Sequence, residues 1–155
     1  GVPDRAATVV EQLRERIAVV TARVSSRDRP NVFVLEWSDP PFLSGHWVPD
    51  LVTAAGGNPI LSERGSRSVP TDWTTIAQHD PDIVVVAPCG FGLDGAIAQA
   101  DTVLGKLPDR AEVWAIDADG LVVRPGPRVV DGVEAFSLIF HPDGVAVHPA
   151  TRQIR

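Results

Sequence analysis

The residues best suited to hold a ligand are concentrated between positions 36 and 47. Two carboxylates, a histidine, two tryptophans, a phenylalanine and two prolines occur there. An apolar run at 32–35, typical of a buried strand, precedes this stretch, and a segment typical of a helix follows it at 48–55. Because ligands of α/β proteins bind beyond the carboxyl ends of strands, we expect these side chains to form a binding site. The candidates are Glu36, Trp37, Pro40, Pro41, Phe42, His46 and Trp47.

Three later segments follow predicted strands in the same way, at 88–92, 117–120 and 124–128. In a parallel sheet such exits share one edge, so we expect all four segments to converge. They add four candidates, namely Cys89, Gly90, Phe91 and Arg124. Aromatic faces, rigid prolines, backbone N–H groups and an arginine together suit a large ligand that is partly flat and partly polar.

Several candidates also have an ordinary structural interpretation. Phe42 and Trp47 could be core residues, and His46 could be a surface or helix-capping residue instead of a group that bonds a ligand or a metal. The aromatic residues at 37 and 91 lie beyond the predicted strand ends, so core packing is the weaker interpretation for them. We expect four side chains to be largely exposed on one rim: Trp37, Pro40, Pro41 and Phe91.

Arg124 has two interpretations. Its five N–H donors suit the amide, carboxylate or phosphate groups of a ligand. It could equally form a surface salt bridge with Asp117 or Asp119. The sequence leaves both interpretations open.

The single cysteine, Cys89, does not establish an enzyme. A thiol at a helix N-terminus can be activated as a nucleophile, but it needs an adjacent general base, and no spacing identifies one. A buried structural cysteine is the simpler interpretation. A metal cluster of Glu36, His46, Cys89 and Asp117 lacks the local ligand spacing of known sites. We therefore predict no catalytic residue, no metal site and no resident cofactor.

The composition is that of one soluble domain of 155 residues, with 44% apolar and 22% charged residues. The net charge of −6 disfavours nucleic acid as a partner, because phosphate binding requires a basic surface. No apolar run approaches the ~18 residues of a membrane span. The chain contains no Met, so we expect it to be a processed product or a part of a longer protein.

Predicted strands and helices alternate along the chain. Strands are expected at 31–36, 83–87 and 112–116, with short extended pieces at 58–61 and 121–123; helices are expected at 3–24, 48–55, 72–78, 93–104 and 128–140. This order predicts an α/β fold: an open, mainly parallel, Rossmann-like sheet of four or five strands with helices on both faces. The long first helix has no strand before it, so we expect it to connect this domain to a part of the protein that is absent from this chain.

Three runs resemble the cobalamin-type substrate-binding proteins of ABC importers. They are FVLEWSDPPFLSGHWVPDL at 33–51, DPDIVVVAPCGFGL at 80–93 and RPGPRVVDG at 124–132. Members of this class III, helical-backbone family have two α/β lobes joined by one rigid helix and hold the ligand between them. The resemblance implies an inter-lobe helix at 3–25, a C-terminal ligand-binding lobe at 31–142 and a tail at 143–155. The N-terminal lobe is then absent from this chain.

The resemblance also implies a function, which is to capture cobalamin or a related corrinoid outside the cytoplasm and deliver it to an ABC transporter permease. It places Glu36, Trp37, Pro40, Pro41 and Arg124 against the corrinoid. A ferric siderophore or haem is an alternative ligand, with His46 as the natural axial ligand of haem iron. Alternatives of other classes are a doubly wound enzyme that uses Cys89 and an interaction domain without a small ligand.

Permease docking is the point at which the chain departs from the family. Members usually carry a docking glutamate on the short helix after the variable loop, but the aligned residue here is Thr74. The nearest carboxylate is Asp72. Docking through this lobe would therefore use Asp72 or be lost.

Overall fold

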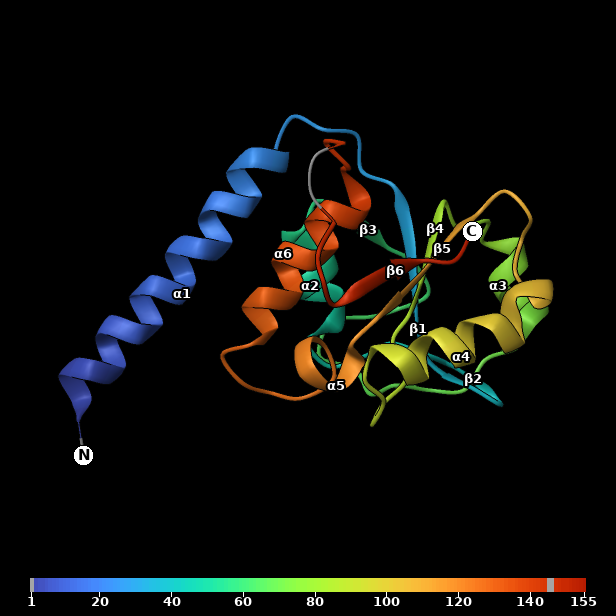
Figure 1. Cartoon of the computed structure of the whole chain (residues 1–155), viewed down its shortest axis with the longest axis horizontal. Helices are drawn as coiled ribbons and strands as arrows, with labels where there is room; N and C mark the ends of the chain where they lie inside the picture. The colour runs from blue at the N-terminus through green and yellow to red at the C-terminus, as the bar shows by residue number, and fades with distance from the viewer. Residues whose placement is uncertain (1, 145–146) are drawn as a thin grey trace.

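A single mixed sheet forms the centre of the molecule (Figure 1), whose computed structural model describes residues 2–144 and 147–155. Its strand order is β2-β1-β4-β5-β6, and β3 pairs with the remaining part of the β1 edge. The pairs β1–β3, β1–β4 and β4–β5 are parallel, whereas β1–β2 and β5–β6 are antiparallel. The strands are β1 (Asn31–Ser38), β2 (Pro41–Leu43), β3 (Asn58–Pro59), β4 (Ile83–Val86), β5 (Glu112–Ile116) and β6 (Thr151–Gln153).

Helices cover both faces of this sheet, as the sequence predicts. They are α1 (Pro3–Val24), α2 (Val48–Ala54), α3 (Trp73–Gln78), α4 (Leu93–Val103), η1 (Leu104–Lys106), α5 (Ala118–Leu121) and α6 (Val129–Phe140). Successive residues of a strand point to opposite faces, and β1 divides its apolar side chains accordingly. Val32 and Val34 join the core beneath α2 and α6, whereas Phe33 and Leu35 join the core beneath α3 and α4. The predicted mainly parallel α/β fold is therefore confirmed.

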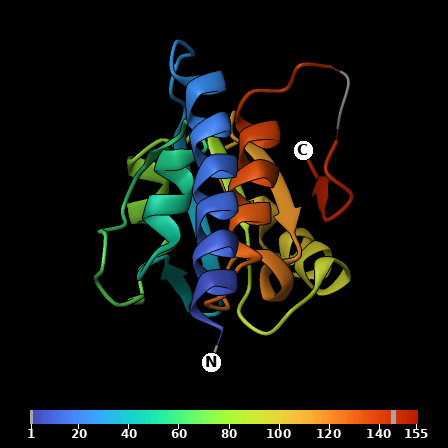
Figure 2. The ribbon, with the colours of Figure 1, turned by 90° about the vertical axis from the view of Figure 1, so that its left-hand side faces the viewer.

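Helix α1 lies along α2 and α6 (Figure 2) and confirms the helix predicted at 3–24. Val20 and Val24 near its C-terminus are buried, whereas residues 2–12 are all exposed. Arg16 donates to Glu134 and Asp131 of α6. The second half of α1 is thus anchored to the sheet domain, and the first half is not.

Two helix ends carry residues that are typical of caps. Gly56, with φ of 89°, follows the end of α2 in the left-handed region that glycine adopts readily. Asp72 caps the N-terminus of α3 by accepting from the backbone N–H of Thr75 at 2.8 Å. No helix in the described part of the chain is long and apolar enough to cross a membrane.

The stretch at 36–47 is not the simple loop that the sequence suggests. Strand β1 continues to Ser38, the chain turns at a cis Asp39–Pro40 bond, and β2 returns antiparallel to β1. Pairing of Trp37 with Phe42 extends the sheet beyond the apolar run. The prediction that Trp37 lies past the strand end is therefore wrong.

Two further local predictions are also wrong. Residue 121 ends α5 and is not extended, because Asp117 caps that short helix by accepting from the backbone N–H of Gly120 at 2.9 Å. The tail contains strand β6, in which Gln153 pairs with Trp114 of β5. The sheet consequently has six strands instead of the four or five expected.

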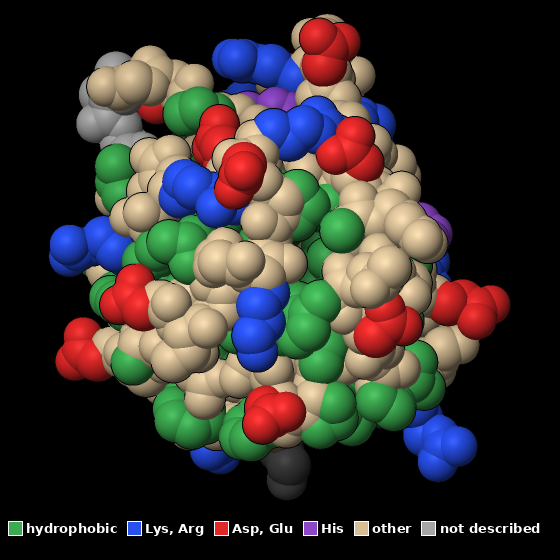
Figure 3. Space-filling model, turned by 90° about the vertical axis from the view of Figure 1, so that its right-hand side faces the viewer, with side chains coloured by type: hydrophobic (Ala, Val, Ile, Leu, Met, Phe, Trp, Pro, Cys, Tyr) green, Lys and Arg blue, Asp and Glu red, His purple; other side chains and the backbone are tan. Residues whose placement is uncertain are grey.

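The end of the molecule that carries α3 has a mixed surface (Figure 3). Acidic and basic side chains are interspersed there with apolar ones. Such a face differs from the continuous basic surface that nucleic acid requires. It agrees with the net charge of −6.

Candidate functional site

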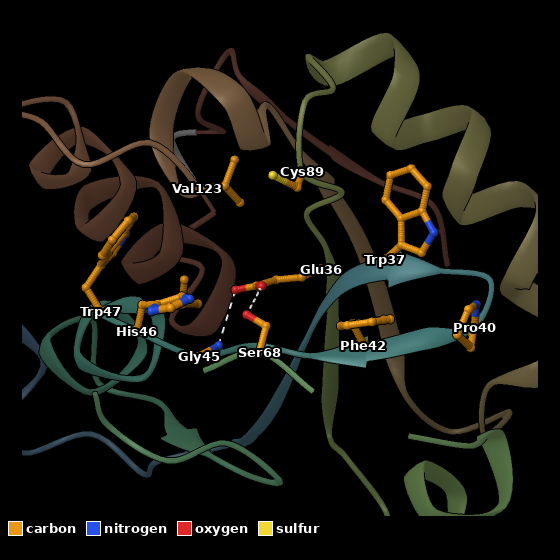
Figure 4. A pocket seen from close by; sticks show the side chains of 11 residues that line it. Glu36, Trp37, Pro40, Phe42, Gly45, His46, Trp47, Ser68, Cys89 and Val123 are labelled. Atoms are coloured by element: carbon orange, nitrogen blue, oxygen red, sulfur yellow. Dashed lines mark hydrogen bonds between the residues drawn. The ribbon is translucent and has the colours of Figure 1, made fainter. Parts of the chain in front are cut away.

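A cavity of about 640 Å³ lies at the carboxyl end of the sheet. The end of β1, the turn and β2, the start of α2, the loop after β4 and the segment after α5 all contribute to it (Figure 4). Its walls are formed by Glu36, Trp37, Pro40, Phe42, Gly45, His46, Trp47, Val48, Ser68, Cys89 and Val123. Two of the four chain exits expected to converge, at 36–47 and 88–92, line this cavity and bring seven of the predicted site residues together. The exits at 117–120 and 124–128 contribute no residue to its wall.

Glu36 is a half-buried carboxylate in the cavity wall. The backbone N–H of Gly45 donates to its Oε1 at 3.3 Å, and the hydroxyl of Ser68 donates to its Oε2. Burial raises the pKa of Glu36 above its ordinary value, and these two hydrogen bonds offset the rise only in part. The carboxylate is thus held in a fixed position with part of its accepting capacity unused.

Aromatic side chains form the apolar part of the site. The indole N–H of Trp47 donates to the carbonyl of Val122 at 2.8 Å, which fixes the ring in the wall. Trp37 donates to the carbonyl of Asp39 at 3.0 Å, and its ring lies 5.9 Å from that of Phe91. Phe42 is half-buried beside them. Each tryptophan thus has its polar atom satisfied by protein and leaves ring surface for a ligand.

Exposure of the rim residues agrees with the sequence prediction only in part. Trp37, at 37% exposure, and Pro40 are exposed as predicted. Phe91 is half-buried and not largely exposed, because its ring packs on Trp37. Pro41 is buried, because it pairs with Ser38 within the hairpin. The prediction of an exposed Pro41 is wrong, and neither it nor Phe91 lines the cavity itself.

His46 lies at the mouth of the cavity with its side chain exposed. Its backbone has a φ of 54°, which is uncommon for a residue with a side chain. Two hydrogen bonds fix this conformation: the His46 N–H donates to Ser66 O at 2.6 Å, and Gly65 N–H donates to His46 O at 2.9 Å. The imidazole is therefore presented to solvent from a well-defined backbone.

Cys89 also lines the cavity, and it is exposed. The interpretation of a buried structural cysteine is therefore wrong. In residues 2–144 and 147–155, no histidine or carboxylate is hydrogen-bonded to its thiol, and no group of three potential metal ligands occurs. Gly90, which follows in the turn with φ of 85°, does not line the cavity.

Arg124 forms a surface salt bridge, the second of the two interpretations that the sequence leaves open. Its Nε donates to Asp119 Oδ1 at 2.5 Å, and its side chain is 71% exposed. This interaction raises the pKa of Arg124 above its ordinary value. Its neighbour Val123 lines the cavity, so Arg124 stands at the rim rather than in the wall.

Sequence patterns do not indicate two further residues of the site, Gly45 and Ser68, which hydrogen-bond to Glu36. The loop at 62–70 packs against the end of β2, where Leu43 N–H donates to Val69 O at 2.9 Å. A Cβ on Gly45 would lie 2.5 Å from Ser68 N, so only glycine permits this approach. Ser68 reaches Glu36 across 32 positions of sequence, a contact that local patterns cannot reveal.

Comparison with known proteins agrees with this architecture. The family model described as periplasmic binding protein matches residues 1–118. The chain belongs to the periplasmic binding protein family. Its members are substrate-binding proteins, and this membership indicates an extracytoplasmic location. No curated protein sequence matches the chain.

Solved structures of the family share the fold. A periplasmic haem-binding protein from Pseudomonas aeruginosa is 25% identical with a TM-score of 0.76, and the match covers 99% of this chain and 59% of that protein. The periplasmic vitamin B12 binding protein BtuF of Vibrio cholerae is 20% identical with a TM-score of 0.70, over 90% of this chain and 55% of that protein. The chain thus spans little more than half the length of these family members.

The two residues considered for docking onto a family permease both lie at α3 and are exposed. The carboxylate of Asp72 is occupied locally, because it accepts from Thr75 N at 2.8 Å and from Thr75 Oγ1 at 2.9 Å. These hydrogen bonds lower the pKa of Asp72. Thr74 carries no charge, so any electrostatic docking at α3 depends on Asp72.

Proposed function

We propose that this chain is the C-terminal lobe of a substrate-binding protein of an ABC importer, and that it captures cobalamin or a related corrinoid. The observation that carries the proposal is the aromatic cavity at the carboxyl edge of the sheet. Its volume falls within the range of small-molecule sites, and its walls combine ring faces with a few fixed polar groups. Eight of its eleven lining residues also belong to the first of the three runs that resemble cobalamin-type binding proteins, and Cys89 belongs to the second.

Capture between two lobes accounts for the surfaces left open. The cavity opens to solvent beside exposed residues at 37, 40, 46 and 89, so a large ligand seated there keeps one face uncovered. The first half of α1 is exposed along its length, including Val9 and Val10. A second lobe at the end of α1 would cover the free face of the ligand and part of this helix.

Binding without chemistry is the proposed activity. The tryptophan rings provide flat apolar contact for a corrin ring, and Glu36 and Ser68 provide polar contacts. Arg124 keeps the four N–H donors of its terminal amines for a ligand group at the rim, since only its Nε is engaged. The loaded protein would then deliver the corrinoid to a permease, with Asp72 as the candidate contact on this lobe.

Haem is a second candidate ligand, favoured by one observation. His46 presents an exposed imidazole at the cavity mouth, where it could serve as an axial ligand to haem iron. A structural neighbour from Pseudomonas aeruginosa is described as a haem-binding protein. Ferric siderophores are a third possibility within the same family, represented by a Saccharomonospora viridis protein of a ferric hydroxamate transport system at 23% identity and a TM-score of 0.56.

Titration of the full-length, two-lobe protein tests the proposal. Cyanocobalamin, haemin and a ferric hydroxamate are added separately, and binding is followed by calorimetry and by quenching of tryptophan fluorescence. We expect cyanocobalamin to bind with the lowest dissociation constant. Tighter binding of haemin, with a spectrum that changes in His46→Ala, would replace the corrinoid with haem. Absence of binding by all three ligands would refute the proposed site.

A further inference from the structure

Glu36 dominates the electrostatics of the cavity. Among the described residues that line it, Glu36 is the one carboxylate, and none is Lys or Arg. Arg124, the arginine that the sequence predicts for the site, is paired with Asp119 at the rim. A ligand that enters the cavity therefore meets negative charge, with the other titratable groups of the wall being His46 and Cys89.

The carboxylate is placed for recognition and is not a solvated surface charge. Its two oxygens accept from Gly45 N–H and from the Ser68 hydroxyl, which fixes its orientation. A carboxylate offers about four lone-pair sites, so acceptor sites remain for a ligand. Figure 4 shows Glu36 extending from β1 toward Ser68 and Gly45, with Cys89 and Val123 across the cavity.

We propose that Glu36 selects for ligands that present uncharged N–H donors to this wall, such as the peripheral carboxamides of a corrinoid, and against ligands that present carboxylates there. This inference rests on the proposed function and specifies the chemistry of its ligand. An amide N–H can donate to the free lone pairs of Glu36, whereas a ligand carboxylate has no donor and adds a like charge in a partly desolvated site. Haem propionates and carboxylate siderophores would therefore be disfavoured against this wall.

The test compares cyanocobalamin with its monocarboxylic acids, in each of which one peripheral amide is hydrolysed. Dissociation constants are measured by calorimetry for the full-length protein and for Glu36→Gln, which keeps the shape of the side chain and removes its charge. We expect at least one of the acids to bind the wild type about tenfold or more weakly than cyanocobalamin. In Glu36→Gln this discrimination should fall to less than about threefold.

Asp101→Asn provides the matched control, because it removes one negative charge at an exposed position of α4 outside the cavity. It should retain the full discrimination of the wild type. Equal binding of all the acids by the wild type, or discrimination that persists in Glu36→Gln, would overturn the inference while leaving corrinoid capture intact. Failure of every corrinoid to bind would instead overturn the proposed function and this inference with it.

Discussion

Arg16 connects α1 to the sheet domain, and its removal should measurably loosen that connection. Its Nε donates to Glu134 Oε1 at 2.9 Å and its Nη2 to Glu134 Oε2 at 2.7 Å, a two-pronged contact with one carboxylate. The same Nη2 lies 2.6 Å from Asp131 Oδ1. These contacts raise the pKa of Arg16 further above its ordinary value, so the guanidinium is charged at every accessible pH. We therefore predict that Arg16→Ala destabilises the protein.

The magnitude follows from the geometry and the exposure. The side chains of Arg16, Asp131 and Glu134 are 40%, 31% and 37% exposed, so solvent screens each pair. A partly exposed pair contributes up to about 1 kcal/mol, and the upper end applies to two-pronged networks. Two pairs give a loss of about 1–2 kcal/mol. For a chain of this size that corresponds to a fall in Tm of about 3–6 °C.

Urea and thermal unfolding of the 155-residue chain, followed by circular dichroism, measure this loss. Arg14→Ala is the matched control, because Arg14 is exposed on the same helix and forms no ion pair with any residue that the structure describes. Its effect should stay within about 0.5 kcal/mol. Arg16→Lys should fall between the two, since an ammonium cannot reproduce the two-pronged contact. Equal stability of Arg16→Ala and Arg14→Ala would refute the reasoning.

Three further predictions concern the cavity. Glu36→Gln should be more stable than the wild type at pH 7, because burial raises the pKa of Glu36 in the folded state and its ionisation therefore opposes folding. Urea unfolding should show that this difference in stability vanishes near pH 4, below the ordinary pKa of a glutamate of ~4.3. Trp37→Ala should weaken corrinoid binding about tenfold in calorimetry with little change in Tm, whereas Trp37→Phe, which keeps a ring, should retain most of the affinity. Arg124→Ala should raise the dissociation constant up to about tenfold; unchanged affinity would show that its contact with Asp119 is its whole role.

The central elements could be predicted because their signals are local. The unbroken apolar run of β4 indicates a strand buried on both faces, and the three- and four-residue spacing of valines with Leu13 and Ile17 indicates α1. Both elements were found where expected. The alternation of such elements was also sufficient to predict a parallel sheet between two helical layers.

The edge strands could not be predicted because pairing, and not composition, creates them. Strands β2 and β6 have three residues each, too few for a pattern to show. Ser38 pairs with Pro41 only because the chain reverses at Asp39 and Pro40. Likewise, Cys89 follows a fully buried strand, and nothing in its neighbours indicates that the turn carries it back into solvent.

The position of Glu36 follows from the strand that builds the core. Val32 and Val34 point to the face covered by α2. Glu36 lines the cavity together with Trp47 and Val48, at the register shift that interrupts the pairing of β1 with β2. There α2 has only begun, at Val48, so the side chain meets the cavity and not a packed helix. Strand β1 thus brings the carboxylate to the cavity, whereas Ser68, from a distant loop, determines how it is held. A carboxylate partly buried in this way lowers the stability of the fold at neutral pH, and that loss is expected where a side chain is retained to recognise a ligand.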